Sequence, residues 1–268
     1  MNTARSLLLA QLLVSLAVPG RAKRPADDPG SDRLQSELLA AAPSVPAFQA
    51  RAPVRLGWES SRRPEAARWS AYAESVVSLY LDEFDKAADA PLFCRRYASL
   101  DRDQRVEVWA DVMAWVSYWE TGWDPRNRTA EPDQGVDDVT GRPVYSEGLL
   151  QLSYQDRDSN PYCAFDWTAD KNLPAGDLRR SILNPYENLY CGVRTMADLV
   201  AKNGRAAVAQ GGYWSTLQLG SVHDRSRQIE REVGGLPFCG GRSHGAVAEG
   251  VLRALKDAQA KLKALGER

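Results

Sequence analysis

The chain has 268 residues and a formal net charge of −1 at pH 7. No basic run or stripe stands out, so we expect no nucleic-acid partner. The 44% hydrophobic content is ordinary for a soluble globular protein and is enough for a sizeable core. Eight tryptophans and ten tyrosines supply flat faces, which suit a protein core and also the C–H faces of sugar rings.

The N-terminus has the pattern of a secretory signal. Arg5 precedes an apolar run over residues 6–18, and the stretch Pro-Gly-Arg-Ala, which ends at Ala22, follows it. This run is too short to cross a bilayer, and no later apolar stretch is long enough to do so. We therefore expect a signal peptide over residues 1–22, export to the periplasm or the cell exterior, and no stable insertion in a membrane.

Four cysteines follow the expected cleavage point. In an exported protein an even number of cysteines favours disulfides, here two. The cysteines lack the paired spacing of metal ligands, and the two histidines lie far apart, so we expect no metal site and no cofactor. Among the three possible pairings, we favour Cys163 with Cys191 and Cys94 with Cys239.

The N-terminal third of the chain divides into an arm and the first helix of a domain. Residues 23–64 are rich in Pro, Arg, Ser and Ala, which predicts a linker or a loosely packed arm. We expect a single domain over residues 65–268. Its first helix follows Pro64, because large apolar residues recur there at steps of three and four. These residues are Trp69, Tyr72, Val76, Tyr80 and Phe84.

The next predicted helix carries the first candidate catalytic group. Its apolar stripe consists of Val106, Trp109, Met113 and Val116 and ends in Glu120. A carboxyl group on the buried side of a helix end loses solvent, which raises its pKa and lets it keep a proton, as a general acid must. The alternative is a Glu that turns into water or pairs with an Arg, which is commoner for any single Glu.

The second half of the chain predicts further helices and one long polar loop. The loop, residues 124–144, holds several acids, and loops of this size are often functional. Residues 146–152 predict a short helix, in which Gly148 indicates a close approach of another backbone or a ligand. Asn184–Pro185 opens another helix, and residues 245–265 predict a last amphipathic one. No repeat and no convincing alternating strand pattern occurs, so we expect a mostly helical fold.

Three segments in order resemble a known family. A Glu followed by Thr, an aromatic and a Pro stands at 120–125, a Gly-Leu-Leu-Gln stretch stands at 148–151, and Asn-Leu-Tyr-Cys-Gly stands at 188–192. Together these segments resemble the transglycosylase-like branch of the lysozyme superfamily, over roughly Trp69 to Leu219. The chain departs from the family pattern in its longer loop after Glu120 and in lacking the usual Ala-Tyr-Asn element.

The resemblance implies a lysozyme-like domain, mostly α within an α+β superfamily, with a cleft for a glycan strand. It implies that the chain is an enzyme, a peptidoglycan glycosidase, which cleaves the β-1,4 bond between N-acetylmuramic acid and N-acetylglucosamine. Glu120 is then the catalytic acid and later the base, and a monomer is expected to act on peptidoglycan strands. The candidates for holding the glycan are Gln151, Tyr190, Tyr145, Trp214 and Ser153.

The outcome of cleavage depends on a second carboxylate. A hydrolase of the lysozyme kind pairs its acid with such a group, whereas the resemblance implies that a lytic transglycosylase uses one Glu and forms an anhydro sugar. Candidates for a partner are Asp133, Asp137, Asp138 and Asp156, and no spacing selects one.

Two further hypotheses stay open. One is an inactive wall-binding or structural protein with a lysozyme-like cleft. The other is a glycosidase acting on chitin, chitosan or deacetylated peptidoglycan, because the acidic loop favours amino sugars by charge attraction.

Overall fold

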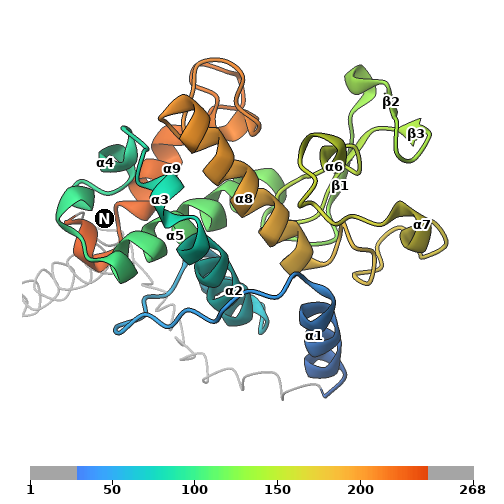
Figure 1. Ribbon diagram of the computed structural model, residues 1–268, viewed down its shortest axis with the longest axis horizontal. Helices are drawn as coiled ribbons and strands as arrows, with labels where there is room; N and C mark the ends of the chain where they lie inside the picture. Colours follow the sequence, from blue (N-terminus) through green and yellow to red (C-terminus); the bar gives the residue numbers. More distant parts are fainter. Residues whose placement is uncertain (1–28, 241–268) are drawn as a thin grey trace, which may run out of the picture.

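The computed structural model describes residues 29–240, so the predicted signal peptide and the predicted last helix lie outside the described residues. Within this range the chain is mostly helical, with two small sheets (Figure 1). The helices are α1 Pro29–Ala41, α2 Ala66–Leu79, α3 Leu81–Phe84, α4 Ala90–Phe93, α5 Arg102–Thr121, α6 Asp156–Ser159, α7 Trp167–Asp170, α8 Pro185–Asn203 and α9 Ser226–Val233. Short 3₁₀ turns cover Gly57–Ser60, Tyr97–Ser99, Pro132–Gln134, Ser215–Leu217 and Pro237–Cys239.

The two sheets are antiparallel pairs that hold the polar loop after α5. Strand β1 (Arg128–Ala130) pairs with β4 (Tyr145–Glu147), and β2 (Val136–Asp137) pairs with β3 (Arg142–Pro143). In Figure 1 the β2–β3 pair projects from the helical body on the side of α6 and α7.

The stretch predicted as a short helix over 146–152 is instead the end of β4 followed by a tight turn. Glu147 pairs with Arg128 across the sheet and bridges to Leu152. The turn between them needs left-handed backbone at Gly148 (φ 78°) and Gln151 (φ 50°), which a helix does not provide.

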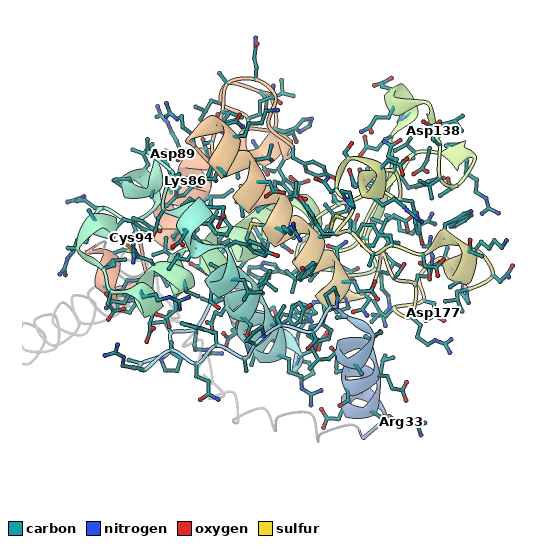
Figure 2. The ribbon with its side chains drawn as sticks, in the orientation of Figure 1. Arg33, Lys86, Asp89, Cys94, Asp138 and Asp177 are labelled. Atoms are coloured by element: carbon teal, nitrogen blue, oxygen red, sulfur yellow. A yellow bond between two sulfur atoms is a disulfide. The ribbon has the colours of Figure 1, made fainter. Side chains whose placement is uncertain are left out.

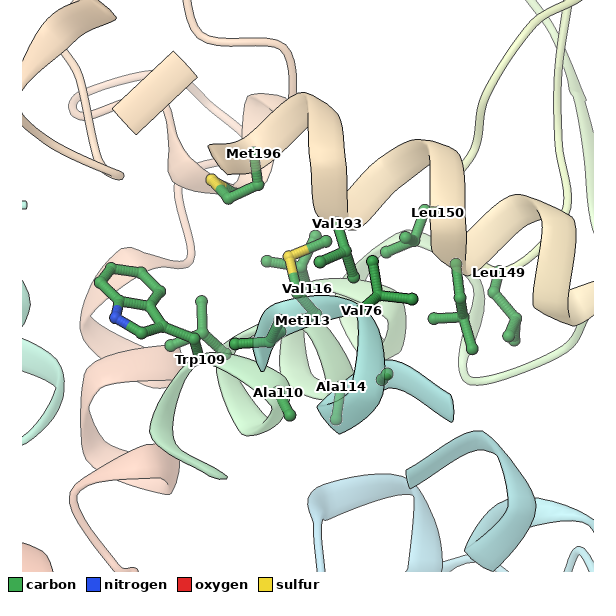
Figure 3. Packing of buried hydrophobic residues seen from close by; sticks show 14 of the residues in the cluster. Val76, Trp109, Ala110, Met113, Ala114, Val116, Leu149, Leu150, Val193 and Met196 are labelled. Atoms are coloured by element: carbon green, nitrogen blue, oxygen red, sulfur yellow. The ribbon is translucent and has the colours of Figure 1, made fainter. Parts of the chain in front are cut away.

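Helix α5 lies at the centre of the core. Its N-terminus is capped by Asp101, which accepts from the backbone of Gln104 at 2.9 Å, and it ends at Gly122 in left-handed conformation (φ 62°). It packs against α2 and α9, while α2 also packs against α8. Figure 3 shows the buried side chains at this junction: Val76 of α2, Trp109, Met113 and Val116 of α5, and Val193 and Met196 of α8.

The stretch of the N-terminal arm that the structure describes packs against the domain. Leu38, Leu56 and Trp58 are buried. The backbone N–H of Val54 donates to Glu107 at 2.9 Å, and that of Gly57 donates to Asp111 at 2.7 Å, so two buried carboxylates of α5 hold the arm.

Both predicted disulfides are confirmed. Cys94 is bonded to Cys239, and Cys163 is bonded to Cys191. None of the described helices is long and apolar enough to cross a membrane.

Candidate active site

Glu120 stands in the last turn of α5, where the buried stripe of the helix ends. The four preceding stripe residues are fully buried, and Glu120 itself is partly buried. The hydroxyl of Thr216 donates to its Oε1 at 2.8 Å. Thr216 lies in the 3₁₀ turn Ser215–Leu217, so a segment almost a hundred residues downstream orients the carboxyl group.

Glu120 opens into a cleft with a volume of about 780 Å³. One wall comes from the β1–β4 pair and the loop after β1, and the other comes from the turns around residues 151–156 and 212–215. The lining residues are Glu120, Thr129, Glu131, Gln134, Ser146, Gln151, Ser153, Gln155, Asp156, Gly212, Tyr213, Trp214, Ser215 and His223. A volume of this size is typical of ligand sites, which span roughly 300–1,000 Å³.

The environment of Glu120 favours its protonated form. Burial is the main cause that raises the pKa of its carboxyl group, and the negative charge of Glu131 raises it further. The hydrogen bond from Thr216 opposes both effects, because it stabilises the carboxylate. A carboxyl group with a raised pKa in a cleft is suited to protonate a leaving oxygen.

The Gly-Leu-Leu-Gln stretch forms the tight turn beside this carboxyl group, and its glycine has a steric reason. A Cβ on Gly148 would come within 2.7 Å of the carbonyl oxygen of Ile182 and would also clash with Asn188. The Asn188 side chain accepts from the backbone of Leu150 at 2.8 Å and donates to the carbonyl of Glu147 at 3.1 Å. The turn is therefore fixed to the start of α8.

Gly192 of α8 lies at the same contact between the turn and α8. A Cβ at this position would clash with the side chain of Leu150, so the absence of a side chain lets α8 approach the turn. The three segments on which the family resemblance rests thus meet at one place in the structure.

Gln151, Ser153 and Trp214, three of the predicted glycan-binding residues, line the cleft together with Glu120. The Gln151 amide donates to the carbonyl of Gly148 at 3.1 Å, which secures the turn. Trp214 is only 3% exposed, and its indole N–H donates to the carbonyl of Leu150 at 2.8 Å. Trp214 therefore forms part of the wall and does not present an open stacking face.

The other two predicted glycan-binding residues lie elsewhere. Tyr145 points to the opposite side of the β1–β4 pair, where it lines a different cavity and stacks with Arg128 at 4.5 Å. The hydroxyl of Tyr190 lies 3.4 Å from that of Tyr80, and Tyr190 does not line the cleft. Neighbouring residues of a strand point to opposite faces of the sheet. Because Ser146 faces the cleft, Tyr145 faces away from it.

Of the four candidates for a second carboxylate, only one lines the cleft. Asp133 and Asp138 are exposed and do not line the cleft. Asp137 is buried and caps the backbone N–H groups of Val139 and Thr140, both at 2.9 Å. Asp156 does line the cleft.

The carboxylate of Asp156 is engaged in structural hydrogen bonds. Its Oδ2 accepts from the Ser153 backbone at 2.6 Å and from the Tyr213 hydroxyl at 2.5 Å. Burial raises the pKa of Asp156, and these donors oppose that rise. Asp156 therefore ties the two turns of one cleft wall together.

Glu131 is the carboxylate that the sequence did not single out. It follows β1, lines the cleft and is close enough to Glu120 to influence its pKa. Its backbone N–H donates to the carbonyl of Val144 at 3.0 Å, which anchors it to the returning strand. In the sequence Glu131 is one acid among several in a polar loop, and no spacing marks it.

The described residues contain no group of three or more His, Cys, Asp or Glu side chains arranged to hold a metal ion.

No protein-family model and no curated protein matches the chain. Three solved chains are similar in structure, all of Bd0314 DslA: a wild-type form and two forms with one Glu replaced by Gln. The wild-type form is 28% identical, with a TM-score of 0.55, and the match covers 69% of this chain and 98% of that one. The second form is 27% identical with the same coverage.

The two replaced glutamates of DslA stand eleven positions apart in that protein. Glu120 and Glu131 also stand eleven positions apart, and both line the cleft of this chain. The chain shares the fold of DslA over nearly the whole length of that protein.

Proposed function

We propose that the protein is a glycosidase that hydrolyses the β-1,4 bond between N-acetylmuramic acid and N-acetylglucosamine in peptidoglycan. The observation that carries this proposal is the pair of carboxyl groups in one cleft, of which Glu120 has a raised pKa. Glu120 donates its proton to the glycosidic oxygen as the bond breaks. The family resemblance of the three segments supplies the substrate class.

Glu131 takes the second role. Its carboxylate stabilises the positive charge that develops on the sugar ring, or it activates a water molecule. Asp156 is less suited to this role because Ser153 and Tyr213 already occupy its oxygen. The shared interval of eleven residues with the two glutamates exchanged in DslA supports the assignment.

A second carboxylate favours hydrolysis over internal transfer. Hydrolysis leaves reducing ends, whereas transfer to the 6-hydroxyl of muramic acid leaves anhydro ends that are lighter by one water. Mass spectrometry of the soluble products from purified sacculi is expected to show reducing ends. Products with anhydro ends only would contradict the role of Glu131 in hydrolysis.

The role of Glu131 has its own test. Glu131→Gln is expected to reduce the rate of product release by roughly 100-fold or more, because the charge that assists the reaction is lost. Asp138→Asn is the matched control, since Asp138 belongs to the same polar loop but lies on the projecting β2–β3 hairpin (Figure 2). An equal effect of the two substitutions would argue against Glu131.

The charge of the cleft favours a second candidate substrate. The cleft is lined by Glu120, Glu131 and Asp156, and no Lys or Arg of the described chain lines it. Such a cleft attracts a positive charge, so glycan strands with free amino groups, as in deacetylated peptidoglycan or chitosan, fit its electrostatics better than fully acetylated strands.

Parallel digestion decides between the two substrates. Walls prepared in acetylated and deacetylated form are compared by the rate of product release at low and high salt. Faster cleavage of the deacetylated wall, with an advantage that shrinks as salt rises, is expected if the carboxylates select the substrate. Equal rates on both walls would exclude this selection.

A further inference from the structure

A second cavity lies back to back with the cleft. It has a volume of about 330 Å³ and shares the β1–β4 pair as a wall. Thr129 and Ser146 face the cleft, while Arg128, Tyr145 and Glu147 face the cavity. This arrangement follows from the alternation of side chains along a strand, so a few residues of backbone separate the two spaces.

The acidic side chains of this cavity already have ion-pair or hydrogen-bond partners within the protein. Glu147 is 2% exposed and lies between Arg128 and Arg180, each with a nitrogen 2.6 Å from its Oε2. Asp170 accepts from the hydroxyl of Tyr154 at 2.9 Å and from the backbone of Ser181 at 2.8 Å. The third acid, Asp137, accepts the backbone N–H groups already described.

Two of the cations at the same cavity have no carboxylate partner among the described residues. Arg142 stacks on the ring of Trp167 at 4.8 Å, so its guanidinium is oriented over the cavity wall. Neither Arg142 nor Lys171 has a carboxylate partner among the described residues, and both side chains are exposed. With Arg128 and Arg180 the cavity is lined by four cations against three acids.

The two cavities therefore carry opposite charge. Among the described residues, the cleft is lined by three acids, of which Glu120 has a raised pKa, and by no Lys or Arg, whereas the cavity behind it has an excess of cations that face solvent. One polymer matches both: a peptidoglycan strand carries a positive charge in its glycan wherever a sugar has a free amino group, and free carboxylates in the peptide that muramic acid carries. The loop over residues 131–144 contributes to both spaces, so it forms the rim between them.

We propose that the cavity behind the β1–β4 pair binds a carboxylate of the peptide attached to the glycan, with Arg142 and Lys171 as the groups that receive it. The proposal rests on the proposed function only in taking peptidoglycan as the source of this carboxylate. A guanidinium held over an aromatic ring keeps its N–H groups available to a carboxylate, and the neighbouring ammonium adds charge.

Binding of isolated peptides tests the proposal without cleavage. Isothermal titration is performed on the full chain with two probes: a short wall peptide that has free carboxylates, and the same peptide with every carboxylate amidated. The free acid is expected to bind the native protein, with an affinity that falls as salt rises. The amidated peptide is expected to bind at least tenfold more weakly.

Substitutions locate the site. Arg142→Gln with Lys171→Gln is expected to reduce the affinity for the free acid by roughly tenfold or more, since two charge-assisted contacts are lost. Arg95→Gln with Lys202→Gln is the matched control, because it makes the same change of net charge at two other exposed positions. A circular-dichroism melt shows whether each variant is folded.

Three results would overturn the proposal: no binding of the free acid, equal binding of the amidated peptide, or equal loss in the control pair. None of them depends on catalysis. Cleavage of peptide-free glycan strands by the native protein would still support the proposed function if the peptide failed to bind. Conversely, a protein without glycosidase activity that bound the acid through Arg142 would retain this site.

Discussion

At the scale of single residues, the protonation of Glu120 depends on two neighbours that act in opposite directions. Burial and the charge of Glu131 raise the pKa of Glu120, and the hydrogen bond from Thr216 lowers it. Because a general acid works only while it is protonated, the proposed role of Glu120 predicts that activity is lost as pH rises through the pKa of this group. The alkaline limb of the pH–rate profile therefore reports on this carboxyl group.

Thr216→Val tests the contribution of Thr216 to the pKa of Glu120. The substitution removes the donor that stabilises the Glu120 carboxylate, so the pKa of Glu120 rises and the alkaline limb moves to higher pH. A hydrogen bond to a charged group is worth roughly 1.5 kcal/mol or more, which corresponds to a displacement of about one pH unit. The pH dependence of product release is the measurement.

Thr168→Val makes the same chemical change at an exposed position of α7 and is expected to leave the profile in place. A Thr216→Val profile that coincided with that of the control would show that the hydrogen bond does not set the pKa.

The position of Glu120 at the end of a buried helical stripe was predictable from the sequence, because the spacing of apolar residues reveals such a stripe. Glu131 was not, because its position depends on the pairing of β1 with β4, and strands of three residues leave no periodic signal. Tyr145 was misplaced for the same reason: the face of a strand is set by its register, and a shift of one residue reverses it.

At the scale of elements, the turn after β4 joins α5, the β1–β4 pair and α8. The sequence marked Gly148 as a place of close approach, and the structure shows the approaching groups to be Ile182 and Asn188. The expectation of a helix over 146–152 was wrong because the pairing of Glu147 with Arg128 and with Leu152 outweighs local preference.

Gly148→Ala is expected to destabilise the protein by about 2–5 kcal/mol. The substitution adds the cost of left-handed backbone for a residue with a side chain to the cost of a clash. Gly141→Ala is the matched control, because Gly141 also has positive φ (64°) but has no atom within 4 Å of an added Cβ. Chemical denaturation gives both free energies of unfolding.

The difference between the two variants isolates the clash. A cost for Gly148→Ala no greater than that for Gly141→Ala would mean that the turn can move away from α8, and the tight junction described above would be incorrect.

At the scale of the whole molecule, the pattern of helices was largely predictable. Long apolar stripes predicted α5, α8 and a helix after Pro64, which the structure divides at Tyr80 into α2 and α3, and the cysteine pairing was confirmed. The two disulfides fit an oxidising compartment and so support the proposed export. Composition suggested a loose arm before Pro64, yet Trp58 of that segment is fully buried, because contacts with distant helices are not encoded in local composition.

The stability of the whole fold is expected to depend on pH through Glu74. This residue of α2 is 6% exposed, and burial, followed by the charges of Glu107 and Glu59, raises its pKa to about 8. An unfolded Glu ionises near pH 4.3. Between these values the unfolded chain releases a proton that the folded chain keeps, so the free energy of unfolding falls as pH rises from about 4 to about 8.

Glu74→Gln removes this titration while keeping the shape of the side chain. The variant is expected to match the native protein near pH 4 and to be more stable at pH 8 by an amount on the order of 2–4 kcal/mol. Glu37→Gln, at an exposed position of α1, is expected to show no such divergence. Parallel curves of unfolding free energy against pH for Glu74→Gln and the native protein would contradict the burial of an uncharged Glu74.

The measurement that tests the central claim most directly is the rate at which Glu120→Gln releases soluble fragments from purified sacculi, with Asp133→Asn as the folded control. Loss of the proton donor is expected to reduce the rate by at least roughly 1,000-fold, while the variant still binds the wall and the control keeps the native rate. Release at the native rate by Glu120→Gln would contradict the claim. Wall binding by the native protein without any soluble product would instead identify an inactive wall-binding protein.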